Sequence, residues 1–525
     1  MKRFAYTLFL LVFSSLLFAQ AKVITYPAPV SERMNTSYEV FVNGQKLDIY
    51  RALSPKFVGG EYYFCYFDFE GEVEVKVKTW KTFTKQVSPT KTQAEKDAAA
   101  KLIVGEVLPR WLNAKVSRNE ATFKANKPFK AIVVRNKTIK PLIIFGNSIE
   151  KNPPKKSDKN VVYFGAGVHY LDKQIELKDN QILYIAGGAV VKAPVFANGA
   201  KNVKICGRGV ISLDNFERWS VGCMNFVDCK NLEISGVILK DTVNWSVVFR
   251  DCDNVKVDNF KLCTSRMIND DAFDICNSTN VSITNTFARC EDDVIAIKGI
   301  YGGSKDFFKI RKVGYTNYLF LENQGMERSL KGDIDWVNRM NNRPVENIFI
   351  RDCIFWTDSA NIFRIGYECC APYFKNLRCE NLFVPFYAPY RDPKIGTWSH
   401  AIVNLQAANE MPILDMHFEN ITINSNGKDM VLLNALPRDI FYAEQKGYGR
   451  IENISIKNVI VEGLKSYKKE TFNGEICIIG KDSSHDVKNV KVENLTYFGE
   501  KKTPENLKIH IGDYASGIDI LGKKK

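Results

Sequence analysis

The stretch NLEISGVIL at residues 231–239 carries the pattern on which the fold depends: an asparagine, then alternating apolar and polar residues, then a turn. Variants of this phrase return along the chain from about residue 160 onward. They begin at Asn202, Asn231, Asn254, Asn280, Asn347, Asn376, Asn420, Asn453 and Asn489. The early units follow one another at intervals of 29, 23 and 26 residues, and the later intervals are mostly longer.

A repeat of this length built from short strands is typical of a solenoid. Alternation alone also fits a β-sandwich or a barrel. However, no Asn-Gly hairpin signal falls between the units from 202 to 300, and the leading asparagines could stack as a ladder at successive turns. We therefore expect an all-β chain whose main part is a right-handed parallel β-helix with coils about 4.8 Å apart.

The region before residue 159 has a different pattern. Residues 22–158 hold longer alternating strands and an Asn43-Gly44 turn, which favour an N-terminal antiparallel β-sandwich domain. The following stretch, rich in Pro, Lys, Asn and Ser, is typical of a linker, so the β-helix domain is predicted at 159–525. Two long inserts, 301–343 and 384–412, are expected to wall the binding face of the helix.

Residues 1–21 have the layout of a secretory signal peptide. Lys2 and Arg3 precede an apolar run that ends in Ala19-Gln20-Ala21. The run is short for a full membrane span. We expect an exported protein, periplasmic or extracellular, with no membrane insertion after signal cleavage.

Charge and cysteine content exclude several classes of function. The formal net charge is +14, which suits an acidic polymer as partner but equally a solvated lysine-rich surface. The lysines are dispersed, so nucleic acid is not expected as a partner. The thirteen cysteines show no paired C-x-x-C spacing, so neither a zinc site nor a disulfide framework is predicted, and no cofactor is expected.

Two clusters of acids interrupt the basic chain about one repeat apart. They are Asp270, Asp271 and Asp274 in NDDAFDI, and Glu291, Asp292 and Asp293 in EDDVIAIK. In these strands Phe273, Ile275, Ile295 and Ile297 should point into the coil. If the two strands lie on adjacent coils, Asp271 and Asp274 should lie beside Asp292, Asp293 and Lys298 on one face.

Carboxylates that crowd together push one another's pKa values apart, so one can stay protonated while another stays ionised. Inverting glycosidases need such a pair, about 6.5–9.5 Å apart to admit a water. The alternatives are turn residues that bond their own backbone and a calcium site. The joint occurrence of both clusters, one coil apart and beside a cation, favours catalysis, and no metal is predicted.

NDDAFDI followed by EDDVIAIK resembles the N-T-D-G-x-D and D-D-x-I-A-I-K motifs of glycoside hydrolase family 28, the polygalacturonases. The upstream segment VNWSVVFRDCDNVKV is similar to that family as well. The resemblance implies the parallel β-helix known as the pectin lyase fold, with Asp271, Asp292 and Asp293 as catalytic acids. It further implies that one acid of the D-D pair protonates the leaving oxygen while the other two activate water.

The chain departs from the family 28 pattern beyond the D-D pair, where the G-H-G and R-x-K motifs are missing. At the place of G-H-G stands SANIFRIGYE, residues 359–368. This stretch is similar to the related family 49 dextranases, which share the β-helix, the three acids and an N-terminal β-sandwich. The missing R-x-K removes the family's usual grip on a galacturonate carboxylate.

Further residues are predicted to bind substrate beside the acids. They are Asp274, Lys298, Arg364, Tyr367 and Glu368. In NIFRIG, Arg364 should face outward, where it could bind substrate, tune a pKa or form a salt bridge to a neighbouring coil. Trp245, Trp336, Trp356 and Trp398 could stack on sugars, although packing is the commoner role of a tryptophan.

The sequence thus predicts an exported inverting glycoside hydrolase that acts on a polysaccharide or oligosaccharide. A pectin-type galacturonide is the first expected substrate and a neutral α-glucan the alternative. Two rival functions remain on the same β-helix. One is a polysaccharide lyase that uses calcium and an Arg or Lys base, and the other is a non-catalytic glycan-binding protein.

Overall fold

The computed structural model describes residues 21–56, 59–79, 104–117, 119–135, 140–266, 268–300, 335, 339, 342–387, 400–425, 430–438, 447–464 and 475–525. The predicted signal peptide, apart from Ala21, lies outside the described residues. So do most of the 301–343 insert, the middle of the 384–412 insert, Trp336 and Trp398. Within the described part of the chain, no helix is long and apolar enough to cross a membrane.

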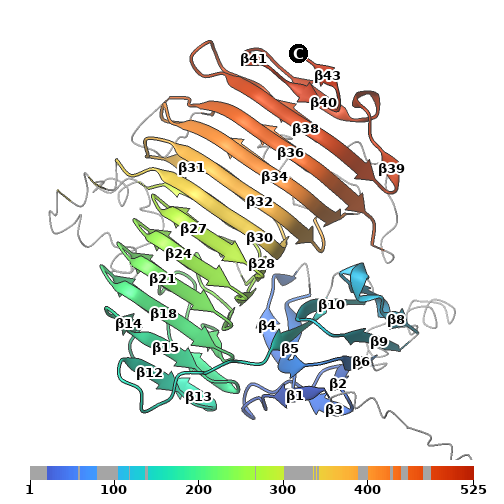
Figure 1. Cartoon of the computed structure of the whole chain (residues 1–525), viewed down its shortest axis with the longest axis vertical. Coiled ribbons are helices and arrows are strands. Elements are labelled where there is room, and N and C mark those ends of the chain that lie inside the picture. The colour runs from blue at the N-terminus through green and yellow to red at the C-terminus, as the bar shows by residue number, and fades with distance from the viewer. Residues whose placement is uncertain are drawn as a thin grey trace, which may run out of the picture.

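From Val161 onward the chain winds through two long sheets that run side by side from the lower left to the top of Figure 1. The larger sheet has 21 strands and is parallel until the short antiparallel pairs at its C-terminal end. Its strands are β12 (Val161–Phe164), β13 (Gly167–Tyr170), β15 (Ile182–Ile185), β16 (Ala189–Lys192), β18 (Lys201–Gly207), β19 (Val210–Ser212), β21 (Lys230–Ser235), β22 (Ile238–Lys240), β24 (Asp253–Asp258), β25 (Lys261–Cys263), β27 (Thr279–Thr284), β28 (Phe287–Cys290), β30 (Val345–Thr357), β32 (Phe374–Val384), β34 (Pro412–Asn424), β36 (Arg450–Glu462), β38 (Val487–Tyr497), β39 (Glu500–Lys501), β41 (Ala515–Ser516), β42 (Asp519–Ile520) and β43 (Lys523–Lys524).

The second sheet has eleven strands, all parallel, one from each coil. They are β14 (Ile175–Leu177), β17 (Val195–Asn198), β20 (Met224–Val227), β23 (Val247–Arg250), β26 (Phe273–Cys276), β29 (Ile295–Gly299), β31 (Phe363–Cys369), β33 (Val403–Gln406), β35 (Val431–Ala435), β37 (Glu475–Ile478) and β40 (Lys508–Ile511). A 3-10 turn, η3 (Pro504–Asn506), precedes β40. These two sheets confirm the predicted parallel β-helix.

The asparagine that opens each repeat is a turn residue in the left-handed conformation. Asn231 has φ of 58° and Asn254 of 55°, a region that Asn tolerates better than most residues. The Asn231 amide donates to Oδ1 of Asn202 (2.9 Å), and the Asn254 amide donates to Oδ1 of Asn231 (2.8 Å). The expected ladder therefore forms, and it ties each coil to the one before.

One predicted member stands on a second ladder. Asn420 donates to Asn381 (3.1 Å) and accepts from Asn458 (3.0 Å), whereas the place on the first ladder belongs to Asp415, which accepts from Asn453 (3.0 Å). From β30 onward each coil has one long strand with two left-handed residues in place of two short strands. The phrase after Asn420 repeats the pattern five residues late, which the sequence alone does not reveal.

The N-terminal region forms two sheets. The inner sheet contains β1 (Lys22–Thr25), β4 (Tyr50–Leu53), β5 (Glu61–Glu70), β7 (Val104–Leu108), β10 (Phe129–Arg135) and β11 (Leu142–Ser148). The outer sheet contains β2 (Tyr38–Val42), β3 (Gln45–Leu47), β6 (Val73–Thr79), β8 (Lys115–Val116) and β9 (Glu120–Ala125), and a 3-10 turn, η2 (Arg110–Leu112), follows β7. All strand pairs are antiparallel, as predicted, except β5 with β11, which is parallel.

The inner sheet is buried on both faces, whereas the outer sheet is buried on one. The β6 sequence VEVKVKT alternates buried and exposed residues, while eight consecutive residues of β5 are buried. One face of β5 packs within the sandwich. The other face, with Tyr62, Phe64 and Tyr66, joins a cluster that includes Val210, Ile238 and Phe287 of the β-helix. Each fully buried aromatic of this kind contributes about 1.5–3 kcal/mol, so the sandwich is docked firmly on the 21-stranded sheet (Figure 1).

Charged contacts fix the docking at both ends of this interface. Arg208 forms a bidentate ion pair with the buried Asp68 of β5, at 2.8 and 2.9 Å. At the far end, Arg110 of η2 contacts Glu462 and donates to the carbonyl of Gly463 at 2.7 Å. A buried ion pair costs desolvation, but it fixes relative orientation.

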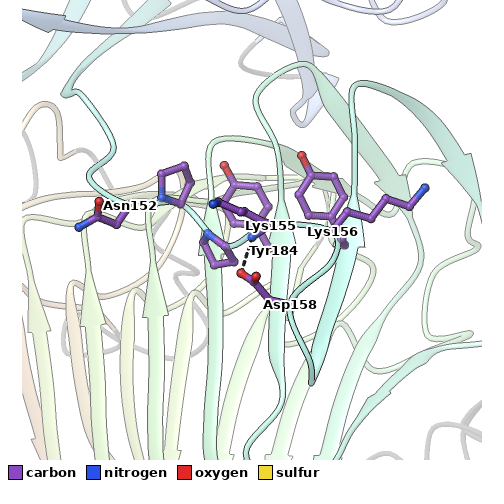
Figure 2. A pocket seen from close by; sticks show the side chains of 8 residues that line it. Asn152, Lys155, Lys156, Asp158 and Tyr184 are labelled. Atoms are coloured by element: carbon purple, nitrogen blue, oxygen red, sulfur yellow. Dashed lines mark hydrogen bonds between the residues drawn. The ribbon is translucent and has the colours of Figure 1, made fainter.

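The linker crosses the first coils of the β-helix and borders a groove there (Figure 2). The groove has a volume of about 820 Å³ and is lined by Asn152, Pro153, Pro154, Lys155, Lys156, Asp158, Tyr163 and Tyr184. Tyr163 and Tyr184 are paired on adjacent strands with ring centroids 5.3 Å apart. This groove involves none of the predicted catalytic acids.

The ladder gives a test of the coil turns. Asn347 donates to Asn280 (3.0 Å) and accepts from Asn376 (2.8 Å) at φ of 59°. Asn347→Gly should lose these bonds at about 1 kcal/mol each or less. Asn347→Ala should lose a further ~1–2 kcal/mol because alanine is strained in this conformation. Urea unfolding of both variants measures the two effects. Equal unfolding midpoints for Asn347→Gly and Asn347→Ala would contradict the contribution of backbone strain.

Candidate active site

The predicted acids gather on the outward face of the 11-stranded sheet. In β26 and β29 the apolar Phe273 and Ile275 pair with Ile295 and Ile297, and all four enter the core. Asp274 therefore faces outward, and Cys276 stands opposite Lys298 on the next coil. Asp270 and Asp271 precede β26, and Asp292 and Asp293 precede β29, so parallel register brings the two clusters together.

Lys298 is the cation at the centre of the cluster. Its Nζ lies 2.9 Å from Oδ2 of Asp271 and 2.6 Å from Oδ1 of Asp274. It also lies 3.6 Å from the ring centroid of Trp245, which packs over it. All of these side chains are buried.

Burial works against charge on Lys298, but the surrounding carboxylates outweigh it. Asp271, Asp274 and Glu368 together raise the Lys298 pKa well above its usual value. Burial raises the pKa of Asp271 and, more strongly, that of Asp274, and Lys298 opposes both shifts. Lys298 thus stays charged and favours the ionised form of its two neighbours.

Asp293 has its own set of partners on the following coil. Its Oδ1 accepts from the backbone amide of Asn361 at 3.0 Å and from the Asn361 side chain at 2.6 Å. Its Oδ2 lies 3.4 Å from Nε of Arg364. Arg364 in turn donates to Gln406 at 2.5 Å. These contacts fix the orientation of the Asp293 carboxyl group.

Asp292 differs from both neighbours because no cation is bonded to it among the described residues. Its Oδ2 accepts from the amide of Asn269 (3.0 Å) and its Oδ1 from the amide of Asp293 (3.0 Å). It is partly exposed, whereas Asp271 and Asp293 are buried. Burial of the carboxyl, followed by the charges of Asp271, Asp293 and Glu291, raises the Asp292 pKa well above the usual range.

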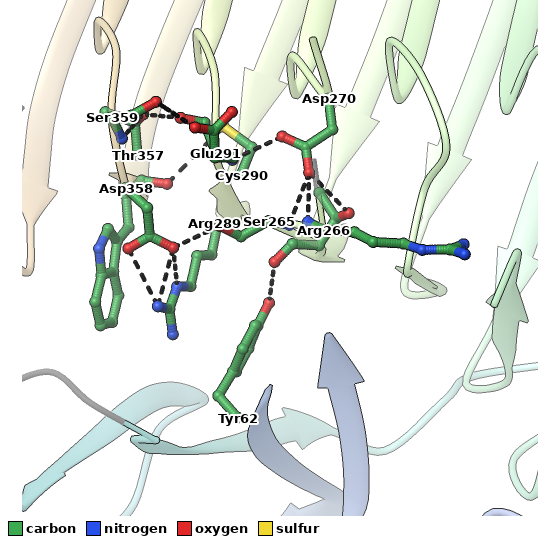
Figure 3. Close-up of polar contacts among 12 residues, drawn as sticks. Tyr62, Ser265, Arg266, Asp270, Arg289, Cys290, Glu291, Thr357, Asp358 and Ser359 are labelled. Atoms are coloured by element: carbon green, nitrogen blue, oxygen red, sulfur yellow. Dashed lines mark hydrogen bonds and ion pairs between the residues drawn. The ribbon is translucent and has the colours of Figure 1, made fainter. Parts of the chain in front are cut away.

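Asp270 organises the backbone instead of facing the site. Its Oδ2 accepts from the amides of Ser265 (2.9 Å) and Arg266 (2.8 Å), and its Oδ1 accepts from the amide of Glu291 (2.7 Å) (Figure 3). A weaker bond of 3.3 Å reaches the amide of Asp292. Asp270 thereby joins the two turns that carry the acid clusters.

The remaining predicted residues are distributed as follows. Asp274 and Glu368 are buried beside Lys298, so both act on it electrostatically from within the protein. Arg364 faces outward next to Asp293, with Phe363 and Ile365 in the core as expected. Tyr367 lies in β31, but its side chain is outside the described residues.

Three residues of the site were not predicted. Asn361 bonds Asp293, Asn269 holds Asp292, and Gln406 bonds Arg364. Asn361 is itself fixed, because its Oδ1 accepts from the amide of Ala401 and the side chain of Asn404. Gln406 could have been found from the strand alternation, which puts it with Arg364 and Asn404 on the outward face of neighbouring coils.

The arrangement brings Asp292, whose pKa is raised well above the usual range, next to Asp271 and Asp293, which are each paired with a cation. Such a set can deliver a proton to one atom and remove a proton from another. Among the described residues, no group of three or more His, Cys, Asp or Glu side chains has a geometry that could hold a metal ion. All thirteen cysteines are buried, and none of them forms a disulfide.

Comparisons with known proteins identify relatives of this site. Residues 170–382, which include all three acids, match the model of glycosyl hydrolases family 28. Polygalacturonase QRT2 of Arabidopsis thaliana is 27% identical over 137 residues, which cover 23% of this chain and 30% of that protein. The matched part thus spans less than a third of that relative.

A solved structure, Dex49A from Penicillium minioluteum, resembles the fold with a TM-score of 0.59 at 13% sequence identity, covering 91% of this chain and 92% of that one. This likeness concerns the fold alone. With the family match, it confirms the predicted resemblance to family 28 with a relation to family 49. The family match supports a relation to the glycoside hydrolases over residues 170–382.

Lys298 offers a test of the electrostatics. Lys298→Met should further raise the pKa of Asp271, since the opposing cation is gone. A base must be deprotonated, so the acid limb of the kcat/KM profile should move to higher pH, with activity at least about tenfold lower on that limb. Lys256→Met, at an exposed lysine of β24, is the control. An unshifted acid limb in the Lys298 variant would contradict this account.

Asn361 offers a test of geometry. Asn361→Ala removes the 2.6 Å bond to Asp293 and both bonds that fix the amide. We expect kcat to fall by roughly 10- to 100-fold with little change in KM, because a misplaced carboxylate is a poorer base. Asn231→Ala, which also loses two side-chain bonds but on the outer ladder, should leave kcat unchanged. Steady-state kinetics at one pH distinguishes the two.

Proposed function

We propose that this protein, related over its catalytic coils to the glycosyl hydrolases of family 28, is an inverting glycoside hydrolase whose catalytic acids are Asp271, Asp292 and Asp293. Asp292 is the general acid, and Asp271 and Asp293 together form the base. The observation that carries this assignment is the asymmetry of their surroundings. Lys298 is bonded to Asp271 and Arg364 is paired with Asp293, while Asp292 receives two backbone amides and the repulsion of three acids.

The reaction follows from these protonation states. Asp292 donates its proton to the glycosidic oxygen as the bond from that oxygen to the anomeric carbon breaks. A water on the opposite side of the sugar loses a proton to the base and forms the new bond to the anomeric carbon. Asp292 ends ionised and the base protonated, and exchange with solvent restores both. The Oδ1 atom of Asp271 is buried without a hydrogen-bond partner among the described residues, which suits it to receive a water.

The first candidate substrate is a pectin-type galacturonide, because the family 28 match spans the coils that carry the acids. A neutral α-glucan is the alternative. The R-x-K motif that would bind a galacturonate carboxylate is missing from the sequence beyond the D-D pair. Both cations bonded to the acids, Lys298 and Arg364, already have carboxylate partners.

A glycan panel decides among these functions. The purified protein is incubated with polygalacturonate, dextran and other plant, algal and microbial glycans, and the product anomer is followed by NMR. Inversion at the anomeric carbon is expected. A retained anomer would contradict the mechanism, and an ultraviolet-absorbing double bond abolished by a chelator would identify a lyase instead.

Asp292→Asn tests the general acid. An amide holds no transferable acid proton, so kcat should fall by about 10²–10⁴-fold. In the wild type, activity should fall as pH rises through the raised pKa of Asp292, because the acid must be protonated to act. Glu493→Gln, at a half-buried acid of β38 that is paired with Lys491, is the control. Reducing-sugar release that is unchanged in Asp292→Asn while glycan still binds would leave only a binding function.

A further inference from the structure

A buried polar network runs from the N-terminal sandwich to the turns that carry the acids (Figure 3). It begins at Tyr62 of β5. The Tyr62 hydroxyl donates to the backbone carbonyl of Thr264 at 2.7 Å, across the interface between the two parts of the molecule. Tyr62 is fully buried, so this hydrogen bond is not exchanged with water.

The Tyr62 ring also covers a buried arginine. The Arg289 guanidinium lies between the rings of Tyr62 (4.2 Å to the centroid) and Trp356 (4.0 Å). Arg289 forms a bidentate pair with Asp358, with contacts of 3.0–3.1 Å. Stacking and bidentate pairing both restrict a guanidinium to one plane. Trp356, considered above as a sugar-stacking residue, therefore contributes to the interface.

Asp358 then reaches the strained turn before the first acid cluster. Its Oδ2 accepts from the Ser265 hydroxyl at 2.5 Å. Ser265 has φ of 103°, a conformation that a non-glycine residue keeps only when its surroundings impose it. Three contacts impose it: this bond, the Ser265 amide bond to Asp270, and the Tyr62 bond to the adjacent Thr264.

Hydrogen bonds connect the same turn to the backbone of Asp292, the proposed general acid. Thr264 and Ser265 both donate to Oδ2 of Asp270, and the other oxygen of Asp270 accepts from the amides of Glu291 and Asp292. Each link is a buried or partly buried contact between fixed groups. The path from Tyr62 to Asp292 crosses from one structural unit to the other.

We propose that Tyr62 is a positioning residue for Asp292, so that the N-terminal sandwich completes the active site of the β-helix. The proposal rests on the proposed function in that Asp292 is the general acid. Tyr62 itself touches no reacting atom. It acts by holding residues 264–266, which bond to Asp270, and Asp270 in turn holds the amides of Glu291 and Asp292.

The test compares two tyrosines of the same strand in the full-length protein. Tyr62→Phe keeps the ring over Arg289 and removes only the bond to Thr264. Tyr66→Phe is the matched control, since its hydroxyl accepts from the Gly188 amide at 3.1 Å, a buried interdomain bond on the first coils. Hydrogen–deuterium exchange of the peptide that contains Glu291 and Asp292 is the readout, because it requires no substrate.

We expect roughly tenfold faster exchange at Glu291 and Asp292 in Tyr62→Phe and no change there in Tyr66→Phe. On a glycan that the wild type hydrolyses, Tyr62→Phe should lower kcat at constant KM and shift the alkaline limb, and Tyr66→Phe should do neither. Ser265→Ala, which breaks the bond to Asp358 without touching the interface, should match Tyr62→Phe.

Equal protection of Glu291 and Asp292 in all three variants would overturn the proposal. Tyr62→Phe removes one hydrogen bond, which costs about 1–3 kcal/mol, so the variant is expected to fold, and Ser265→Ala tests the second half of the path, from the turn to Asp292. An unimpaired Asp292→Asn enzyme would instead refute the role of Asp292 as general acid and leave the exchange result standing. The two failures are therefore distinguishable.

Discussion

Parallel register is the constraint on which this structure depends. In a parallel β-helix, residues at equivalent positions of successive coils are forced to within about one strand spacing of each other. Apolar positions then form a continuous core, and turn asparagines form ladders. Acids that occur at equivalent turns are brought together in the same way, and they must be compensated. Lys298, buried between Asp271 and Asp274, supplies that compensation on one side, and Arg364 with Asn361 supplies it for Asp293.

The three acids are not compensated equally by cations, and this difference distinguishes Asp292 from Asp271 and Asp293. A cation bonded to a carboxylate favours its ionised form, whereas a neighbouring carboxylate opposes that form. Here the third acid, Asp292, is held by backbone amides that Asp270 and its neighbours keep in place. Asp270, which has no catalytic position in the family motif, thus orders much of the backbone around the site. This role of Asp270 can be recognised only from the hydrogen bonds of the turn.

The sequence predicted what depends on local periodicity. Alternation in the two acid-bearing strands correctly turned Phe273 and Ile275 inward and the acids outward, and the repeated asparagines predicted the ladder. It did not predict contacts that depend on which coil follows which. Asn420 was assigned to the wrong ladder because two equivalent turns share one phrase, and Asn361 was missed because a long insert separates it from Asp293 along the chain. The sandwich was recognised from the sequence. The nearly continuous apolar run of β5, however, was interpreted as ordinary alternation, although such a run indicates a sheet with two covered faces.

That two-faced sheet also bears on how such proteins can diversify. A domain with one solvated face can be transferred to a new host by changing a linker. The inner sheet here presents Tyr62, Phe64 and Tyr66 to residues of several successive coils. The sandwich is therefore inherited together with the coils it covers, and recombination that pairs it with a foreign β-helix must rebuild both surfaces at once. The side chains around the acids on the 11-stranded sheet are not part of this covered face, so they can change while that face stays fixed.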